Sequence, residues 1–575
     1  MSDRRTFLKC LASIAPAITF SELFAAEKSS AHQALVIGNG LYPDMPLSNP
    51  VNDAKAISTL LQRAGFVTDT QINTTRSSMV AAMERFIKSI KQSQTKVVVF
   101  YYAGHGAQLD WRNYLVPVDA TVTKRSDMQS RCVDLNNVLG QISEIKDKTF
   151  IIILDACRDD PFGNSYKLES KGLSQFDAPV GSLLAYSTSP GKVSSDGSGE
   201  NGLYTENLVR ELSLQNVKLE DALKRVRLNV RLASNGDQIP WETTSLESDV
   251  ILFASANKKQ SAGDLERTIQ EEIADWTKIK DSKIEADWIA YLRKYPNGRL
   301  SEVAQERLNR VLAEKTAQKN SLTTMSSSGS SSKNKNEAAQ TKSSSQANKG
   351  ASKGNMAAFA PPSTGGAIRL GPGLVVPTLW KPSQNPYSAG RYHFARVFTV
   401  GDQAKNQMSD VLSGVKGEVR VATVTRVDPD SDIVEINNGL ISMDLMGNAL
   451  SVREVKFDTP LTFTPVEYQI GKKWTAMNTR TVNGHKSIVT FDLHIAAVEK
   501  VRVPAGEFDA FRIEADGWNL TNDIKLNETH WLVPGLNSMI KREVIRRKRN
   551  GVITHSERTE LMELYQQKTL VDVSA

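Results

Sequence analysis

The spacing of hydrophobic and polar positions changes three times along this 575-residue chain. In the first part, short apolar runs alternate with stretches in which apolar residues recur at helical spacing. The runs are Ala34–Gly38, Lys96–Ala103, Phe150–Asp155, Ser182–Ser187 and Ile251–Ala254, and the periodic stretches are Pro50–Ala64, Ser77–Ile90, Tyr204–Leu212 and Leu219–Leu232. Continuous β-rich runs are typical of parallel strands buried on both faces, and the periodic stretches predict helices. We therefore expect an α/β domain over residues 32–255, with a mostly parallel sheet flanked by helices.

A purely helical pattern follows over residues 263–317. Its apolar positions predict one inner face, and Tyr295–Gly298 predicts the turn between two helices. The residues of that face are Trp288, Tyr291, Leu292, Val303, Ala304 and Leu308. The segment resembles a tetratricopeptide-like helical hairpin. One hairpin cannot bury a core alone, so we expect it to pack on a neighbour or to act as a spacer.

Residues 320–363 are rich in Ser, Lys, Asn, Gln and Ala and hold almost no large apolar side chains. Such a segment cannot bury enough apolar surface to offset the entropy of ordering its backbone. We expect a flexible linker that proteases can reach.

From about residue 368 to the end of the given sequence, residues 368–575, apolar and polar residues alternate with a period of two. The predicted strands are Glu418–Val427, Asp432–Ile436, Ser487–Val498, Ala510–Glu514 and Lys541–Arg547. Turn sequences separate them, so we expect an antiparallel β domain, as a sheet or partial barrel. Val501–Phe508 and Trp531–Gly535 resemble segments of periplasmic half-barrel domains of unknown function. That resemblance implies a binding role towards protein, an envelope polymer or lipid.

The N-terminus has the order of an export signal, which we assign to residues 1–26. Arg4–Lys9 is basic, Leu11–Phe24 is apolar, and Ala25-Ala26 supplies small residues. The order Arg-Arg-x-Phe-Leu-Lys resembles a twin-arginine signal, with Asp3 in place of the usual Ser; a Sec signal or an uncleaved anchor is the alternative. No other run reaches the roughly 18 apolar residues of a membrane span. We expect a periplasmic or secreted protein without a transmembrane span in the mature chain.

Charge and cysteine content narrow the function further. The net charge of +7 is mild for this length, and no dense basic run occurs outside Arg546–Arg549, so we expect no nucleic-acid partner. Cys10 lies in the export signal, which leaves two cysteines, too few for a disulfide scaffold. Cys132 is interpreted as a small buried hydrophobe. A disulfide between Cys132 and Cys157 is an alternative, and it would prevent Cys157 from acting as a nucleophile.

Two candidate catalytic residues each follow an apolar strand. His105 follows Lys96–Ala103 and has a glycine on either side, and Cys157 follows Phe150–Asp155. A cysteine attacks a carbonyl as its thiolate, and a nearby histidine can hold the thiol proton and later give it to the leaving amine. Sites in parallel sheets form beyond the carboxyl ends of the strands. The separation, 157 − 105 = 52 residues, is close to the roughly 50 found in caspases.

At these residues the chain resembles the caspase-like superfamily, nearest its metacaspase and paracaspase branches, over about residues 33–254. The matching motifs are Ala34–Asn39, Leu47–Ala54, Tyr101–Gly106, Tyr114–Asp119, Leu154–Cys157, Ala185–Thr188 and Gln238–Glu242. The resemblance implies that His105 is the base and Cys157 the nucleophile. It also implies that the backbone N–H groups of Gly106 and Cys157 form the oxyanion hole.

The same resemblance implies an acidic specificity pocket. Asp155 would point into it, Asp53 and Asp196 would be its second and third acids, and Trp241 would line neighbouring subsites. Carboxylates there select a basic residue before the scissile bond, so we expect cleavage after Arg and less after Lys, whereas true caspases cut after Asp. Each acid also has a structural alternative. Asp155 could cap its strand or form a salt bridge to Arg158, and Asp53 could be an acid at a helix N-terminus, where the helix dipole favours it. Asp196 could serve only to form a turn.

We therefore expect a cysteine endopeptidase that acts on proteins or peptides through a thioacyl intermediate and needs no cofactor. Calcium activates many metacaspases, but the acidic, Gly-rich segment around Asp196 lacks the spaced ligands of an EF-hand, so no metal site is assigned. Three alternatives stay open. They are a non-catalytic caspase-like scaffold, a cell-envelope binding protein whose main activity lies in residues 368–575, and a Cys–His transpeptidase.

Overall fold

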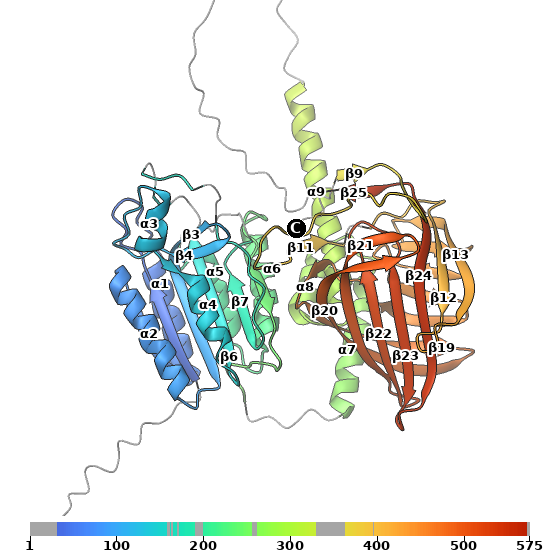
Figure 1. Ribbon diagram of the computed structural model, residues 1–575, viewed down its shortest axis with the longest axis horizontal. Coiled ribbons are helices and arrows are strands. Elements are labelled where there is room, and N and C mark those ends of the chain that lie inside the picture. Colours follow the sequence, from blue (N-terminus) through green and yellow to red (C-terminus); the bar gives the residue numbers. More distant parts are fainter. Residues whose placement is uncertain are drawn as a thin grey trace, which may run out of the picture.

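The computed structural model describes residues 32–157, 161–162, 165–168, 172–189, 199–255, 262–328, 363–394 and 396–571. An α/β unit and a β-barrel lie side by side, and three helices lie between and alongside them (Figure 1). Across the described residues, no helix combines the length and the apolar character that a membrane crossing requires.

The α/β unit is built on a sheet with strand order β2-β1-β3-β6-β7-β8. Its strands are β1 (His32–Gly38), β2 (Val67–Ile72), β3 (Val97–Leu109), β6 (Thr149–Cys157), β7 (Ser182–Tyr186) and β8 (Trp241–Thr244), with the small strands β4 (Arg112–Leu115) and β5 (Val133–Asp134) extending from β3. Every pairing along the main sheet is parallel except that of β8 with β7. The expected fold class, a mostly parallel sheet flanked by helices, is confirmed.

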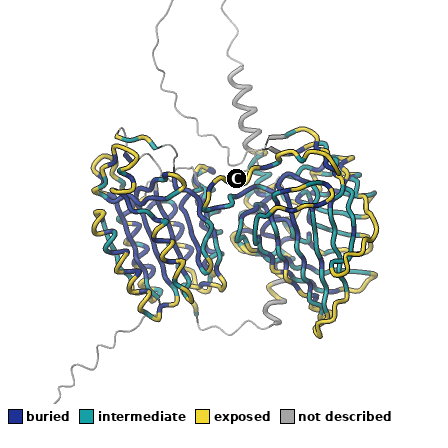
Figure 2. Tube along the Cα trace, in the orientation of Figure 1, coloured by how far each residue is buried: buried dark blue, intermediate teal, exposed yellow. Residues whose placement is uncertain are grey.

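Helices cover both faces of this sheet, and the central strands are buried along most of their length (Figure 2). One face packs on α1 (Pro50–Arg63), α5 (Leu203–Leu212) and α6 (Leu219–Ala233), and the other on α2 (Arg76–Gln92) and α4 (Leu135–Ser143). The short helix α3 (Arg125–Arg131) lies beside β5. Helix α1 begins with a proline, which is favoured at the first helical position.

For two strands of this unit, the sequence-based prediction and the structure differ. The strand expected at Ile251–Ala254 is wrong, because Ile251 forms only an isolated bridge with Lys218 and the last strand is β8. The apolar side chains of Leu252 and Phe253 pack against the α1, α5 and α6 layer instead of continuing the sheet. Strand β2 escaped prediction because its sequence, VTDTQI, is polar and partly exposed at the sheet edge.

Three helices connect the two bodies: α7 (Ala262–Ile279), α8 (Glu285–Lys294) and α9 (Ser301–Ser328). All six apolar residues predicted for the inner face of the hairpin are buried, and they join one core cluster with the barrel. The hairpin therefore packs on a neighbour rather than standing free. Helix α9 continues to Ser328, so residues 320–328 of the expected linker belong to this helix. The rest of that expected linker, residues 329–362, lies outside the described residues.

The C-terminal part is an antiparallel β-barrel. Its wall consists of β12 (Gln403–Ser409), β13 (Lys416–Asp428), β14 (Ile433–Ile436), β15 (Ile441–Met443), β16 (Ala449–Val452), β17 (Val455–Leu461), β19 (Lys473–Val482), β20 (His485–Val503), β21 (Gly506–Asn519), β22 (Ile524–Leu532), β23 (Lys541–Lys548) and β24 (Ile553–Gln566). Because β24 pairs with both β12 and β23, the ladder closes on itself. The antiparallel β domain is confirmed, and the expected half-barrel is corrected to a closed one.

Short strands complete this part: β10 (Ile368–Leu370) pairs with β24, β9 (Ser363–Gly365) with β25 (Thr569–Val571), and β11 (Arg391–His393) with β18 (Glu467–Gln469).

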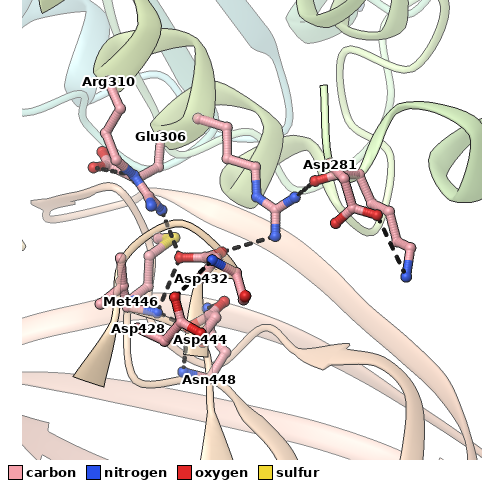
Figure 3. Close-up of polar contacts among 12 residues, drawn as sticks. Asp281, Glu306, Arg310, Asp428, Asp432, Asp444, Met446 and Asn448 are labelled. Carbon is pink, nitrogen blue, oxygen red and sulfur yellow. Dashed lines mark hydrogen bonds and ion pairs between the residues drawn. The ribbon is translucent and has the colours of Figure 1, made fainter. Parts of the chain in front are cut away.

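A buried charged cluster joins α9 to the barrel (Figure 3). Arg307 and Arg310 of α9 reach the two carboxylate oxygens of Asp432 at 2.8 and 2.9 Å. Glu306 and Asp444 are buried beside this pair. Burial raises the pKa of Glu306 to about 7, although Arg310 opposes the shift, and burial together with the Asp432 charge raises the pKa of Asp444 to about 6. The interface therefore holds carboxyl groups that favour their protonated form.

We predict that Glu306→Gln stabilises the protein far more at pH 8 than at pH 5. The folded protein holds the Glu306 proton more tightly than the unfolded chain does, so this contribution to stability is complete below about pH 4.5 and is lost as the pH rises through about 7. Glutamine copies the neutral carboxyl and should recover about 3 kcal/mol at pH 8. Calorimetric unfolding at both pH values measures the difference, and Glu314→Gln, at an exposed position of α9, is the control. An equal shift of the Tm at both pH values would contradict the assignment.

Candidate active site

The two candidate catalytic residues lie on neighbouring central strands. β3 and β6 run parallel, and their register pairs His105 with Cys157 at the last position of their shared ladder, where β6 ends and β3 continues to Leu109. Adjacent strands are about 4.8 Å apart, so the two backbones are direct neighbours although 52 residues separate them in the sequence. This is the position at which sites form in parallel sheets.

The imidazole of His105 is buried and held in one orientation. Its Nε2 lies 2.7 Å from the carbonyl oxygen of Met45 and its ring 4.4 Å from that of Tyr42. A carbonyl oxygen only accepts hydrogen bonds, so Nε2 must carry a hydrogen. In the neutral ring the lone pair is then on Nδ1. The Met45 carbonyl therefore selects the tautomer in which Nδ1 can act as a base.

Two tyrosine hydroxyl groups hold the backbone of His105. Its N–H donates to the Tyr42 hydroxyl at 3.0 Å, and the Tyr102 hydroxyl donates to its carbonyl oxygen at 2.7 Å. Burial raises the pKa of Tyr102 well above the ordinary value, so this phenol stays protonated. Tyr42 and Met45 come from a non-periodic loop after β1, and no signal in the sequence marked them.

Gly104→Ala is predicted to disrupt this arrangement. Gly104 has φ +151°, and an added Cβ would lie 2.7 and 2.8 Å from the Tyr42 and Tyr102 hydroxyl oxygens. The strain should lower the free energy of unfolding by about 1–3 kcal/mol and should also reduce activity by moving His105. Gly140→Ala is the matched control, because Gly140 has open space around it in helix α4 and alanine favours helix. Denaturant unfolding of both variants tests this, and equal stabilities would contradict it.

Two predicted pocket acids are brought together behind the β3–β6 edge. Asp155 is buried on β6, and its Oδ2 accepts a hydrogen bond from the Thr205 hydroxyl at 2.7 Å. Asp53 is buried on α1 and accepts from the backbone N–H of Gly202 at 2.9 Å. Burial raises the pKa of Tyr101, and the charges of Asp155 and Asp53 raise it further, so both carboxylates lie close to this one phenol.

The structure also bears on the structural alternatives for these acids. Asp53 does lie in the first turn of α1, where an acid favours the helix dipole, and it binds Gly202 as well. The alternative salt-bridge partner of Asp155, Arg158, lies outside the described residues, as does the third proposed acid, Asp196. The roles of all three acids in a specificity pocket stay predictions.

The remaining site predictions concern Gly106 and Trp241. Gly106 lies on β3 just beyond His105 and pairs with Leu115. Trp241 is buried on β8, and the guanidinium carbon of Arg391 lies 4.1 Å from its ring centroid. Its ring is therefore covered by the C-terminal part of the chain. The oxyanion-hole and subsite roles of these residues stay predictions.

A contact that sequence reasoning missed joins residues 385–389 to residues 174–177, which lie between β6 and β7. The side-chain amide of Asn385 donates to the carbonyl oxygen of Gln175 at 2.6 Å, and the ring of Tyr387 stacks on that of Phe176 at 4.9 Å. The backbone N–H of Asp177 donates to the carbonyl oxygen of Tyr387 at 2.9 Å. The C-terminal part thus supports a segment close to the site. Local sequence patterns carry no signal for a contact of this range.

The side chains of the described residues include no group of three or more His, Cys, Asp or Glu that could hold a metal ion.

The chain is similar to known proteins in its α/β unit. A family model described as a caspase domain matches residues 31–251. The mucosa-associated lymphoid tissue lymphoma translocation protein 1 of human and its mouse homologue are 30% identical over 126 residues, 22% of this chain. The chain spans only 14% of the mouse and 15% of the human protein. Among solved structures, the Drosophila initiator caspase Dronc is similar at 13% identity, covering 39% of this chain and 85% of that one, with a TM-score of 0.29.

Proposed function

Because residues 31–251 form a domain of the caspase-like cysteine peptidase superfamily, we propose that this protein is an endopeptidase in which Cys157 and His105 form the catalytic dyad. The observation that carries the proposal is the pairing of these two residues at the end of the β3–β6 ladder, with the Met45 carbonyl selecting Nδ1 as the basic nitrogen.

The reaction follows from this arrangement. Nδ1 of His105 takes the thiol proton, and the Cys157 thiolate attacks the peptide carbonyl carbon. The backbone N–H groups of Gly106 and Cys157 stabilise the oxyanion. His105 then returns the proton to the leaving amine as the C–N bond breaks, leaving a thioacyl enzyme. Water, deprotonated by His105, cleaves the thioester and restores the thiol.

The acidic pair around Tyr101 supports specificity for a basic residue. Asp155 lies two residues before Cys157, and the charges of Asp155 and Asp53 both raise the pKa of the buried Tyr101 phenol. A guanidinium group matches carboxylate oxygens with two parallel hydrogen bonds, whereas an ammonium group is a single point charge. We therefore propose cleavage after Arg, and less efficiently after Lys.

We further propose that the protein acts outside the cytoplasm, exported by the twin-arginine-like signal in residues 1–26. Arg4, Arg5 and the following apolar run support this. The thiol of Cys157 must then stay reduced in an oxidising compartment. Fractionation of cells with and without the Arg4→Lys and Arg5→Lys substitutions tests the route.

One assay tests the enzymatic proposal. The protein, kept reduced, is given matched fluorogenic peptides that end in Arg, Lys or Asp, with and without calcium. Cleavage after Arg, with less after Lys, supports the acidic pocket, and cleavage after Asp keeps the peptidase but rejects the pocket. No cleavage, with Cys157 shown to be reduced, favours the non-catalytic scaffold. Ligated products in the presence of an amine acceptor indicate a transpeptidase.

A further inference from the structure

Residues 380–391 form a strap that is anchored on the barrel at both ends. At one end the indole nitrogen of Trp380 donates to the carbonyl oxygen of Asp509, on strand β21, at 3.1 Å. At the other end Arg391 begins β11, which pairs with β18. Between these anchors, residues 381–390 form neither helix nor strand. The conformation of the strap therefore depends on its contacts.

Asn385, in the middle of the strap, uses its whole side-chain amide to bind. The amide nitrogen donates to the carbonyl oxygen of Gln175 at 2.6 Å and to the Ser174 hydroxyl at 3.0 Å. The amide oxygen accepts from the backbone N–H of Tyr387 at 2.9 Å. Asn385 is 7% exposed, so water does not compete for these bonds. An amide both donates and accepts, and this one residue therefore shapes the strap and binds it to the α/β unit.

Asp177 provides a second joint with the strap. Its two carboxylate oxygens accept hydrogen bonds from the Ser388 hydroxyl at 2.8 Å and from the Ala389 N–H at 3.0 Å. Its own N–H donates to the carbonyl oxygen of Tyr387 at 2.9 Å. Hydrogen bonds to a carboxylate are stronger than those between neutral groups. The strap is thus bound on both sides of Phe176 in the sequence, and the Phe176 ring itself stacks on Tyr387.

The segment that the strap binds is tied in turn to the strand that carries His105. The N–H of Ser174 donates to Asn113 Oδ1 at 2.6 Å, and Asn113 Nδ2 donates to the carbonyl oxygen of Ser174 at 2.8 Å. Asn113 is fully buried on β4, which pairs with β3 directly beyond His105. Asn385 and Asn113 therefore both bind Ser174, and Ser174 links the strap to β4.

Leu173, the residue before Ser174, packs directly on Gly106. A Cβ added at Gly106 would lie 2.9 Å from Leu173 Cδ2 and 3.0 Å from the Cβ of Ala156, so no space is left between these groups. Leu173 is buried. Gly106 follows His105 in the sequence, and Ala156 precedes the other residue of the proposed dyad. A shift of Leu173 would therefore release the backbone beside the dyad.

We propose that Asn385 is a positioning residue of the peptidase, an inference that rests on the proposed function. By holding the segment that follows Leu173, it keeps Leu173 packed on Gly106 and so keeps the Gly106 N–H directed at the oxyanion. An oxyanion-hole donor acts in the transition state, where the negative charge develops. The barrel therefore contributes to the rate of peptide cleavage through the strap, although it supplies no group that touches the substrate.

Kinetics of Asn385→Asp in the full chain test the inference. The aspartate can still accept from Tyr387, but it lacks the donor nitrogen and places an oxygen against the Gln175 carbonyl. For a fluorogenic Arg peptide, kcat should fall by about tenfold or more, because the oxyanion donor is displaced, while KM stays within about twofold. Alkylation of Cys157 by iodoacetamide should keep its rate, since it needs the thiolate and not the oxyanion hole. Asn522→Asp, at an exposed position of the barrel, is the matched control and should change none of these values.

Hydrogen exchange read by mass spectrometry gives a second measurement that needs no activity. Asn385→Asp should speed exchange in peptides that cover residues 103–116 and 172–178, and should leave exchange in strands β20 to β22 unchanged. If exchange changes in this way but the unchanged protein cleaves no peptide, the proposed function fails while the hold of the strap on this segment stands.

Two other results would overturn the inference. One is an active Asn385→Asp protein with unchanged kcat, or with unchanged exchange in residues 103–116. The other is an equal loss of kcat and of the alkylation rate with a lowered Tm, which indicates general unfolding. If Asn385→Asp does not fold, Ser388→Ala removes the hydroxyl that binds Asp177 and carries the same test, with a smaller fall in kcat.

Discussion

Replacing Cys157 by alanine is expected to reduce kcat/KM for an Arg-terminated fluorogenic peptide by about 10⁴-fold or more. Without the sulfur no thioacyl intermediate forms, so the oxyanion hole and substrate binding alone remain. His105→Ala should reduce kcat/KM by about 10³-fold, because the thiol then lacks its proton acceptor and the leaving amine its proton donor. Because the two residues act as a unit, the double variant should be little worse than Cys157→Ala.

Cys132→Ala provides the control for this prediction. Cys132 is buried and unbridged, and burial raises the pKa of its thiol to about 12, so it stays a neutral thiol at physiological pH. Its replacement should leave kcat/KM within a factor of two or so of the unchanged protein, apart from a packing cost to stability. Activity that survives in Cys157→Ala, or disappears in Cys132→Ala at unchanged Tm, would contradict the proposed nucleophile.

Asp155→Asn is expected to remove most of the preference for arginine. The relevant measurement is the ratio of kcat/KM for a peptide ending in Arg to that for the same peptide ending in citrulline, the neutral isostere. A charge-assisted hydrogen bond to a carboxylate contributes about 1.5–3 kcal/mol, so the ratio should fall by about 10- to 100-fold. Asparagine can still accept the hydrogen bond from Thr205 through its side-chain oxygen, so the local structure should persist.

Two further variants sharpen this test. Asp53→Asn should lower the ratio by less, because Asp53 is held by Gly202 at the start of α5 rather than on the catalytic strand. Asp119→Asn makes the same chemical change at an exposed position of the same unit and should leave the ratio unchanged. If Asp155→Asn lowers kcat/KM equally for both peptides, the carboxylate has a structural role and the pocket assignment fails.

The candidate site shows where sequence patterns were sufficient. The position of His105 and Cys157 on neighbouring central strands could be predicted because each directly follows a continuous apolar run, and such runs become central parallel strands. Met45, Tyr42 and Thr205 could not be found in this way. They contribute a carbonyl oxygen or a hydroxyl group from a loop or a helix, and no local spacing records which backbone atom will face the imidazole.

The α/β unit and the barrel differ in how much of their structure local sequence patterns predict. The helices α1, α2, α5 and α6 were predicted nearly to their ends, because a buried stripe repeats every three to four residues. Closure of the barrel was not predicted. β12 pairs with β24 across some 150 residues, and nothing in the alternation of either strand specifies its distant partner.

What the amino-acid sequence by itself determined is the fold class and the identity of most of the elements, since these depend on short-range periodicity and on residue type. The tertiary structure alone decided the register of His105 with Cys157, the placement of Asp53 and Asp155 around Tyr101, and the closure of the barrel. These arrangements come from packing and pairing between segments far apart in the chain. Their free energy is gained only when the whole core forms, so no local window of sequence contains it.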